Sequence, residues 1–302
     1  MRTAPRVDDA LPADGCITKG VFRMIAATCL RRTVACGCWL LSFAFLAKNT
    51  SATTQGQDAV AEAAHLPGSG SVVPPQSRGY TVVNVADGAV VRGRVLFTGE
   101  VPEARRMLIT KDEEVCGQGY RERYDVVITA AGGLLNAVIF IEEIQQGKAW
   151  LDAEEGYVLD QKNCAFEPHL QVIPKGRDLN IVNSDPVLHN IHSYELIGRA
   201  RRTLFNFGQP PGKGTITRAL RPRRGNQIRL ECDAHDFMQG WIYAADNPYY
   251  AVVSTDGSFE IADVPAGTYT VKIWHPFLGL QEQQVTLTPS GASEITFQFS
   301  GN

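Results

Sequence analysis

Short runs of strand-forming residues, separated by turn residues, recur along the chain after residue 80 and limit its fold more than any other feature. Residues 89–97, 137–142 and 250–254 are examples, rich in Val, Ile, Phe and Tyr and flanked by Gly, Pro or Asp. Helical spacing of apolar residues is scarce in the same part of the chain. Many short strands with turn signals between them are typical of β-sandwiches, so the sequence predicts an all-β fold.

The sequence LECDAHDFMQG places a thiol, an imidazole and a thioether at intervals of three residues, at Cys232, His235 and Met238. One Cys and two His with a long axial Met form the trigonal site that binds mononuclear electron-transfer copper. The second imidazole must come from another part of the chain, and His189 in the sequence NSDPVLHNIH is the candidate. These four side chains are therefore candidate ligands of one metal ion.

Together the two segments resemble the copper-binding loops of the cupredoxin (blue copper) family, and the short Cys-x-x-His-x-x-Met spacing is most similar to amicyanin. Plastocyanin spaces the Met more widely. The family's first His ligand is followed by Asn, as His189 is by Asn190. The resemblance covers residues 157–246 and implies a cupredoxin-like Greek-key sandwich. It implies one mononuclear (type 1) copper ion bound by His189, Cys232, His235 and Met238.

A structural interpretation of the same residues has to be weighed against the metal site. A lone Cys is usually a small buried hydrophobe, and a lone Met or His more often belongs to a core than to a metal. Because four ligand types fall together on one pattern, we favour copper over a decayed or merely structural cupredoxin.

The resemblance also implies roles for residues beside the ligands. In the family the second imidazole presents its ring edge at the surface, so His235 is the predicted exit for the electron, with Phe237 as an apolar docking patch. The backbone of Asn190 is expected to donate toward the thiolate, and Asp233 and Asp236 to tune the local field. Contacts of this kind orient the ligands and tune the metal.

The C-terminal part of the chain carries a second pattern. Asp256-Gly257 is a hairpin turn signal, and it opens the sequence D-G-x-F-x-I-x-x-V-P-x-G-x-Y-x-V. This pattern resembles carboxypeptidase regulatory-like and transthyretin-like β-sandwiches, which are usually non-catalytic. The strands of 89–142 can pair with this tail, which leaves the cupredoxin-like segment as an insertion.

The N-terminal residues have the pattern of an export signal. Arg31-Arg32 precede the apolar run 33–47, and small polar residues follow it. This order is typical of a secretory signal, and the run is short for a spanning helix, which needs about 20 residues. We expect an exported or periplasmic protein, membrane-anchored if the run is not cleaved. The Ala-, Ser-, Gly- and Pro-rich stretch after it has too little apolar surface to fold and is predicted to be a linker.

Four of the seven cysteines lie within the first forty residues, and three follow. With Cys232 assigned to the metal, Cys116 and Cys164 remain as an even pair. In an exported protein such a pair can form a disulfide, provided that the two Cα atoms approach within about 7 Å. The sequence does not fix that distance, so a disulfide and two free thiols both stay open.

The domain boundaries follow from these patterns. The 302 residues suggest about two domains. We divide the chain into a signal segment (1–52), a flexible linker (53–85), an N-terminal β-strand region (86–156), a cupredoxin-like copper domain (157–246) and a carboxypeptidase regulatory-like β-sandwich (247–302).

The sequence favours a one-electron carrier over an enzyme. It has no Ser/His/Asp nucleophile motif, phosphate loop or dinucleotide fingerprint, and a binuclear copper site needs a second Cys beside Cys232. A formal net charge of −3 gives no reason to expect nucleic acid binding. The expected partner is a redox protein such as a cytochrome or a dehydrogenase. The alternative is a non-catalytic binding module, for surface glycans or for copper delivery, whose cupredoxin domain does not cycle.

A basic segment lies between the two ligand loops. It is either a solvated face or a surface that steers an acidic redox partner, since clustered charge raises association rates. Its residues are Arg199, Arg201, Arg202, Arg218, Arg221, Arg223 and Arg224.

Overall fold

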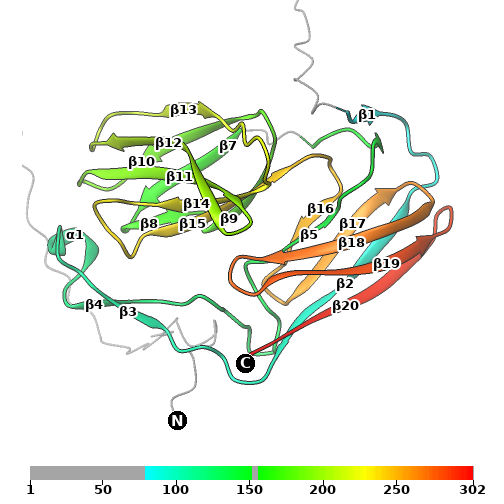
Figure 1. The fold of residues 1–302 in the computed structure, drawn as a ribbon, viewed down its shortest axis with the longest axis horizontal. Coiled ribbons are helices and arrows are strands. Elements are labelled where there is room, and N and C mark those ends of the chain that lie inside the picture. Colours follow the sequence, from blue (N-terminus) through cyan, green and yellow to red (C-terminus); the bar gives the residue numbers. More distant parts are fainter. Residues whose placement is uncertain (1–78, 152–155, 302) are drawn as a thin grey trace, which may run out of the picture. The chain divides into compact units, whose positions relative to one another are not determined.

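The computed structural model describes residues 79–151 and 156–301, and nearly all regular structure within them is β-strand (Figure 1). The all-β prediction is therefore confirmed. The predicted signal segment 1–52 and most of the predicted linker 53–85 lie outside the described residues. Within the described ranges, no helix is long and apolar enough to span a membrane.

Residues 157–246 form two sheets packed around one core, which we call the first sandwich. The strand orders are β13-β10-β7-β8 and β12-β11-β14-β15-β9. β7 pairs parallel with β10 and β9 parallel with β15. The strands are β7 (Tyr157–Lys162), β8 (Ala165–Glu167), β9 (Leu170–Pro174), β10 (Asp178–Asn183), β11 (His189–Ile197), β12 (Ala200–Gln209), β13 (Ile216–Ala219), β14 (Gln227–Glu231) and β15 (Gln239–Ala245).

The buried side chains that alternate along β14 extend the apolar core as far as the candidate site. Ile228 and Leu230 are fully buried and Arg229 between them is half-buried, because successive side chains of a strand point to opposite faces. Cys232 lies two residues beyond Leu230, just past the end of the strand, and is buried in the same apolar cluster. Met238, immediately before β15, belongs to that cluster too. The candidate ligands therefore lie at the edge of the core.

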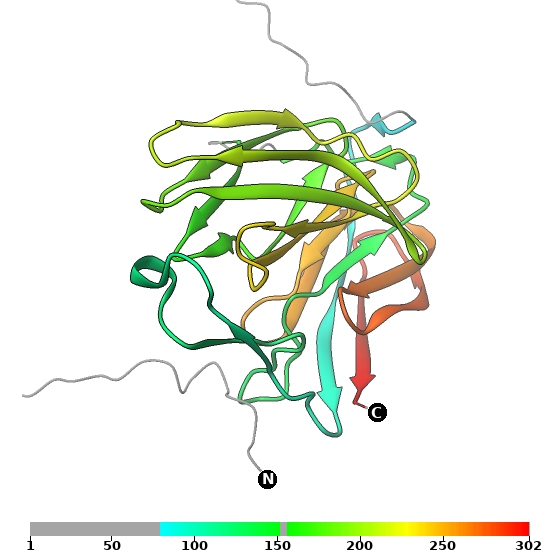
Figure 2. The ribbon, with the colours of Figure 1, turned by 60° about the vertical axis from the view of Figure 1, so that its left-hand side comes forward.

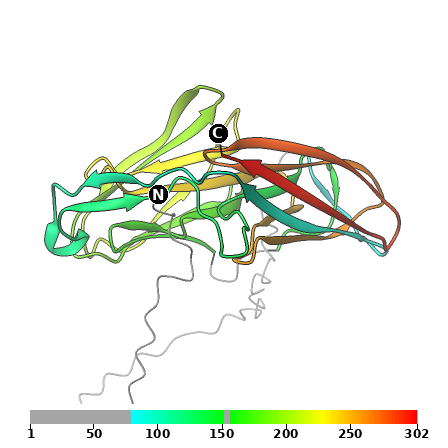
Figure 3. The same ribbon diagram turned by 90° about the horizontal axis from the view of Figure 1, so that it is seen from below.

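The remaining strands form two further sheets around a second apolar cluster. Their orders are β16-β5-β18-β19 and β17-β2-β20, and β2 runs parallel to β20 along its length (Figure 3). The strands are β2 (Ala89–Thr98), β5 (Val138–Ile141), β16 (Tyr250–Val252), β17 (Ser258–Val264), β18 (Gly267–His275), β19 (Gly279–Leu287) and β20 (Ala292–Ser300). A short parallel pair, β1 (Thr81–Val82) and β6 (Gln146–Gly147), lies outside them.

The separation of 86–156 from 247–302 needs correction. β2 pairs with β17 and β20, and β5 pairs with β16 and β18, so strands from both segments complete the same sheets. Residues 157–246 are inserted between β5 and β16, as the sequence suggested. The resemblance of the tail to a carboxypeptidase regulatory-like domain stays a prediction.

Part of the 86–156 segment packs on the first sandwich instead. β3 (Arg105–Leu108) and β4 (Tyr120–Arg123) form an antiparallel pair with the short helix α1 (Glu113–Cys116) between them (Figure 2). We call residues 105–125 the cover. Cys116 of α1 forms a disulfide with Cys164, with the two Cα atoms 5.3 Å apart. The question that the sequence left open is thus answered in favour of the disulfide.

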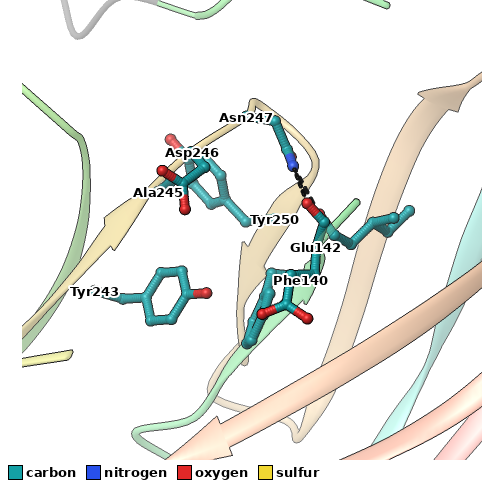
Figure 4. A pocket seen from close by; sticks show the side chains of 8 residues that line it. Phe140, Glu142, Tyr243, Ala245, Asp246, Asn247 and Tyr250 are labelled. Atoms are coloured by element: carbon teal, nitrogen blue, oxygen red, sulfur yellow. Dashed lines mark hydrogen bonds between the residues drawn. The ribbon is translucent and has the colours of Figure 1, made fainter. Parts of the chain in front are cut away.

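The turn from β15 to β16 joins the first sandwich to the C-terminal sheets. The buried side-chain amide of Asn247 donates to the carbonyl oxygens of Ile141, at 2.7 Å, and Glu142, at 3.3 Å (Figure 4). The rings of Phe140 and Tyr243 lie 4.6 Å apart, centroid to centroid. None of the four candidate ligands lines the small pocket between these residues.

Candidate metal centre

The fold brings the predicted ligands together from two loops. His189 is the first residue of β11, whereas Cys232, His235 and Met238 lie in the turn between β14 and β15. All four side chains are buried, with exposed fractions between 0% and 2%. Ligand atoms of His189, Cys232 and His235 all lie within 4.8 Å of one another. Met238 is buried in the apolar cluster that also contains Cys232.

The two imidazoles face each other through the same kind of atom. Nδ1 of His189 lies 3.0 Å from Nδ1 of His235, and Sγ of Cys232 lies 3.7 Å from the latter nitrogen. The rings meet edge to face, with centroids 4.8 Å apart. Two nitrogens and one sulfur therefore converge on one small region.

Each imidazole is held from behind by a carboxylate. Nε2 of His189 lies 2.8 Å from Oδ2 of Asp185, and Nε2 of His235 lies 2.9 Å from Oδ2 of Asp112. An ionised carboxylate only accepts hydrogen bonds, so each Nε2 carries the hydrogen and each Nδ1 presents a lone pair. A carboxylate behind the far nitrogen is the usual support of a metal-binding His.

This arrangement fits a metal ion. Two lone pairs 3.0 Å apart repel each other unless a cation or a shared proton lies between them. Two imidazole nitrogens and a thiol sulfur are ligands that suit copper and zinc. His189, Cys232 and His235 would hold the ion, and Met238, buried in the same cluster as Cys232, would be the candidate fourth ligand.

The electrostatics of the site favour a neutral His and a protonated thiol before metal binds. Burial lowers the pKa of His189, against the hydrogen bond to Asp185 that raises it. Burial raises the pKa of the Cys232 thiol, although nearby backbone N–H groups, that of Asn190 among them, oppose the shift. A cation that takes up the thiolate must displace this proton, so its binding releases protons and strengthens as the pH rises.

The backbone of Asn190 donates to the sulfur, as the resemblance implied. Its N–H lies 3.4 Å from Sγ of Cys232, and its side-chain oxygen accepts from the backbone N–H of Asp233. The side-chain amide of Asn190 also donates to Asn206 and to the carboxylate of Asp233. These bonds tie the two ligand loops together on the side of the thiol.

Asp185 is placed by the turn that carries the disulfide. Its two carboxylate oxygens accept the backbone N–H groups of Asn163 and Cys164, both at 2.8 Å. Burial raises its pKa, but these bonds and the one to His189 outweigh that effect and hold the pKa below its usual value. Asp185 therefore stays ionised and keeps its orientation. The neighbouring group of Cys164, Asp185 and His189 is no second metal site, because the sulfur of Cys164 is in the disulfide.

The predicted surface position of His235 is wrong. The side chain is 1% exposed, and Asp112 of the cover occupies the ring edge that was expected to face a partner. Phe237 is 6% exposed and is no apolar docking patch, since the guanidinium of Arg121 lies 5.3 Å from its ring centroid. The cover fills this face of the first sandwich.

The two carboxylates are the functional residues that sequence reasoning missed. Asp185 lies four residues before His189, and its place in the same loop was the only signal for it. Asp112 belongs to the charged run 111–114, which by itself indicates only a solvated surface turn. It lies 123 residues from His235 in the sequence, so local pattern gave no signal. His192 also stays outside the centre and contacts Asp233 and Thr203 instead.

The solved structures that are similar to this protein cover about a third of the chain. No family model matches the sequence, and no curated protein matches it. Among solved structures, a reduced Cu(I) form of an amicyanin variant is 16% identical, with a TM-score of 0.24, over 31% of this chain and 85% of that chain. A purple cupredoxin from Nitrosopumilus maritimus is 18% identical, with a TM-score of 0.23, over 35% of this chain and 97% of that chain. A copper-containing nitrite reductase from Thermus scotoductus is 17% identical, with a TM-score of 0.24, over 30% of this chain and 22% of that chain.

Proposed function

We propose that this protein binds one type 1 copper ion and carries single electrons between redox partners. The ligands are His189, Cys232, His235 and Met238. The observation that carries the proposal is the convergence of two Nδ1 atoms and one Sγ, with each imidazole fixed from behind by a carboxylate. When bound, copper supplies one-electron redox chemistry at such a site.

The chain's own contribution is a rigid, dry ligand set. His189 begins a strand paired with β12, and the other three ligands lie in a short turn between paired strands. All four are buried, so water is kept from the centre. Ligands that are fixed in this way keep similar positions in both oxidation states, which favours electron transfer over chemistry on a substrate.

The surroundings of this carrier are also proposals. An electron carrier of this kind fits an exported or periplasmic location. Its partner would be a redox protein such as a cytochrome or a dehydrogenase, and we propose no nucleic acid partner. Of the seven arginines of the basic segment, Arg202 is half-buried and paired with the buried Glu195, and the other six are exposed. Arg199 and Arg201 lie at the β11–β12 turn, at the far end of β11 from His189, whereas the other four exposed arginines lie on β13 and in the loop that follows it.

A redox titration of the copper-loaded, full-length protein tests the carrier function. We expect each bound copper to take up and release one electron reversibly, with full recovery of the copper(II) signal in electron paramagnetic resonance. The ligands are held before the electron arrives, so repeated cycles should not release the ion. Copper that binds but is lost on reduction, or cannot be reoxidised, would contradict the proposal and favour the copper-delivery alternative.

A further inference from the structure

The cover contacts the first sandwich at several independent points. The disulfide joins Cys116 to Cys164, and Ile109 lies in the apolar cluster that contains the site. Arg121 donates to the carbonyl oxygen of Asn163 at 2.9 Å. These contacts fix the turn before α1, and with it Asp112, against the metal centre.

The backbone of Asp112 is shaped to aim its carboxylate away from its own helix. Asp112 has a φ of 53° and a ψ of 40°, a left-handed conformation that is uncommon outside glycine. It occupies the N-cap position of α1, where an Asp usually accepts a helix N–H with its side chain. This side chain makes no such bond. It accepts from Nε2 of His235 instead.

The contact between Asp112 and His235 differs from an ordinary ion pair on the protein surface. The side chain of Asp112 is 35% exposed, but that of His235 is 1% exposed. A buried N–H without an acceptor is costly, so His235 needs this carboxylate to keep its present tautomer and ring orientation. In an exposed ion pair, water can replace either partner, and such pairs contribute little to the free energy of unfolding.

We propose that Asp112 is a positioning residue of the metal centre, carried into place by the disulfide-tied cover. Its carboxylate holds the Nε2 hydrogen of His235, so that Nδ1 points toward Cys232 and His189. The cover also closes the ring edge of His235, and a redox partner therefore meets the cover rather than the imidazole. Only the identity of the metal rests on the proposed function, since the contact belongs to the metal-free chain.

The first experiment measures access to His235 in the full-length, metal-free protein. Diethyl pyrocarbonate modifies neutral imidazoles, and mass spectrometry of the peptide gives the rate at His235, with N-acetylhistidine as the unprotected reference. We expect His235 to react at least about tenfold more slowly than the reference, because it becomes accessible only through local opening.

Two variants test whether Asp112 is the cause. Asp112→Gly removes the carboxylate and tolerates the left-handed backbone, and it should raise the rate at His235 about fivefold or more, as expected of easier local opening. Glu113→Ala, a change of the exposed neighbouring carboxylate, should leave the rate unchanged. Wild-type reactivity equal to the reference, or an unchanged rate in Asp112→Gly, overturns the proposal whether or not the protein binds copper.

The second experiment measures positioning through metal affinity. Competition with a chelator for copper(II) should show affinity about 10- to 100-fold lower in Asp112→Gly, the usual cost of losing such a support. Asp112→Asn should recover most of this loss, because its amide oxygen still accepts the Nε2 hydrogen. Equal affinities of Asp112→Gly and wild type contradict the positioning role. A wild-type protein that binds no copper contradicts the proposed function, and the access measurement then decides on Asp112 alone.

Discussion

Replacing Glu195 with Ala is expected to lower the free energy of unfolding of the first sandwich by about 3–5 kcal/mol, the usual cost of breaking a buried ion pair from one side. The side chain of Glu195 is 0% exposed. One carboxylate oxygen accepts the backbone N–H groups of Arg223, Arg224 and Gly225, and the other is paired with Arg202. Without the carboxylate, three backbone donors and a guanidinium lose their acceptor. Urea denaturation at neutral pH measures the loss.

A matched control is available on the surface of the same protein. Glu294 is paired with Arg92 at 2.8 Å, but the two side chains are 73% and 53% exposed. Glu294→Ala should therefore change the free energy of unfolding by no more than about 1 kcal/mol. Equal effects of the two substitutions would show that the Glu195 cluster does not anchor the loop that leads into β14.

The same cluster predicts a pH dependence. Burial raises the pKa of Glu195, but its hydrogen bonds outweigh this effect and lower the pKa from its ordinary value of 4.5 to about 2. A carboxylate with a depressed folded-state pKa stabilises the fold above its unfolded-state pKa, and this stability is lost as the pH falls toward 2. Between pH 5 and about 3, Glu195→Gln should therefore lose less stability than wild type. Parallel pH profiles of the two proteins would contradict the assignment.

Removing the disulfide is expected to have a similarly large effect. Cys116 and Cys164 lie 48 residues apart in the sequence, and closing a loop of that length stabilises a fold by about 4 kcal/mol in the chain-entropy account. The double variant Cys116→Ala/Cys164→Ala should show this loss in urea denaturation. Reducing agent should destabilise wild type and leave the double variant unaffected. A loss below about 1 kcal/mol would show that the cover is held by its apolar contacts instead.

The candidate ligands could be predicted from the sequence because each of them sits in a local pattern. Three candidate ligands share one turn at fixed spacing, and His189 precedes an Asn in the other loop, so residue type and order were sufficient to find the cluster of His189, Cys232 and His235. The contact of the Asn190 backbone with the sulfur was implied by the resemblance and is confirmed. The all-β fold followed from alternation and turn residues in the same way.

The carboxylate of Asp112 behind His235 could not be predicted, because this contact joins segments that are distant in the sequence. Asp112 reaches His235 because the disulfide and the other contacts of the cover hold it against the first sandwich, and neither the bond nor the path of residues 105–125 leaves a periodic signal. The surface position of His235 was inferred from the resemblance to cupredoxins, in which the second imidazole ligand presents its ring edge at the surface. One carboxylate from the cover, that of Asp112, changes that face of the site.

The visible absorption spectrum of the copper(II)-loaded, full-length protein, beside Cys232→Ser, tests the central claim most directly. We expect an intense thiolate-to-copper band at roughly 600 nm in wild type and none in the variant, because the sulfur is the source of the transition. His192→Ala is a matched control that should keep the band, since His192 contacts Asp233 and Thr203 and not the centre. A wild-type protein that binds copper without this band, or a band that survives in Cys232→Ser, would contradict a type 1 site.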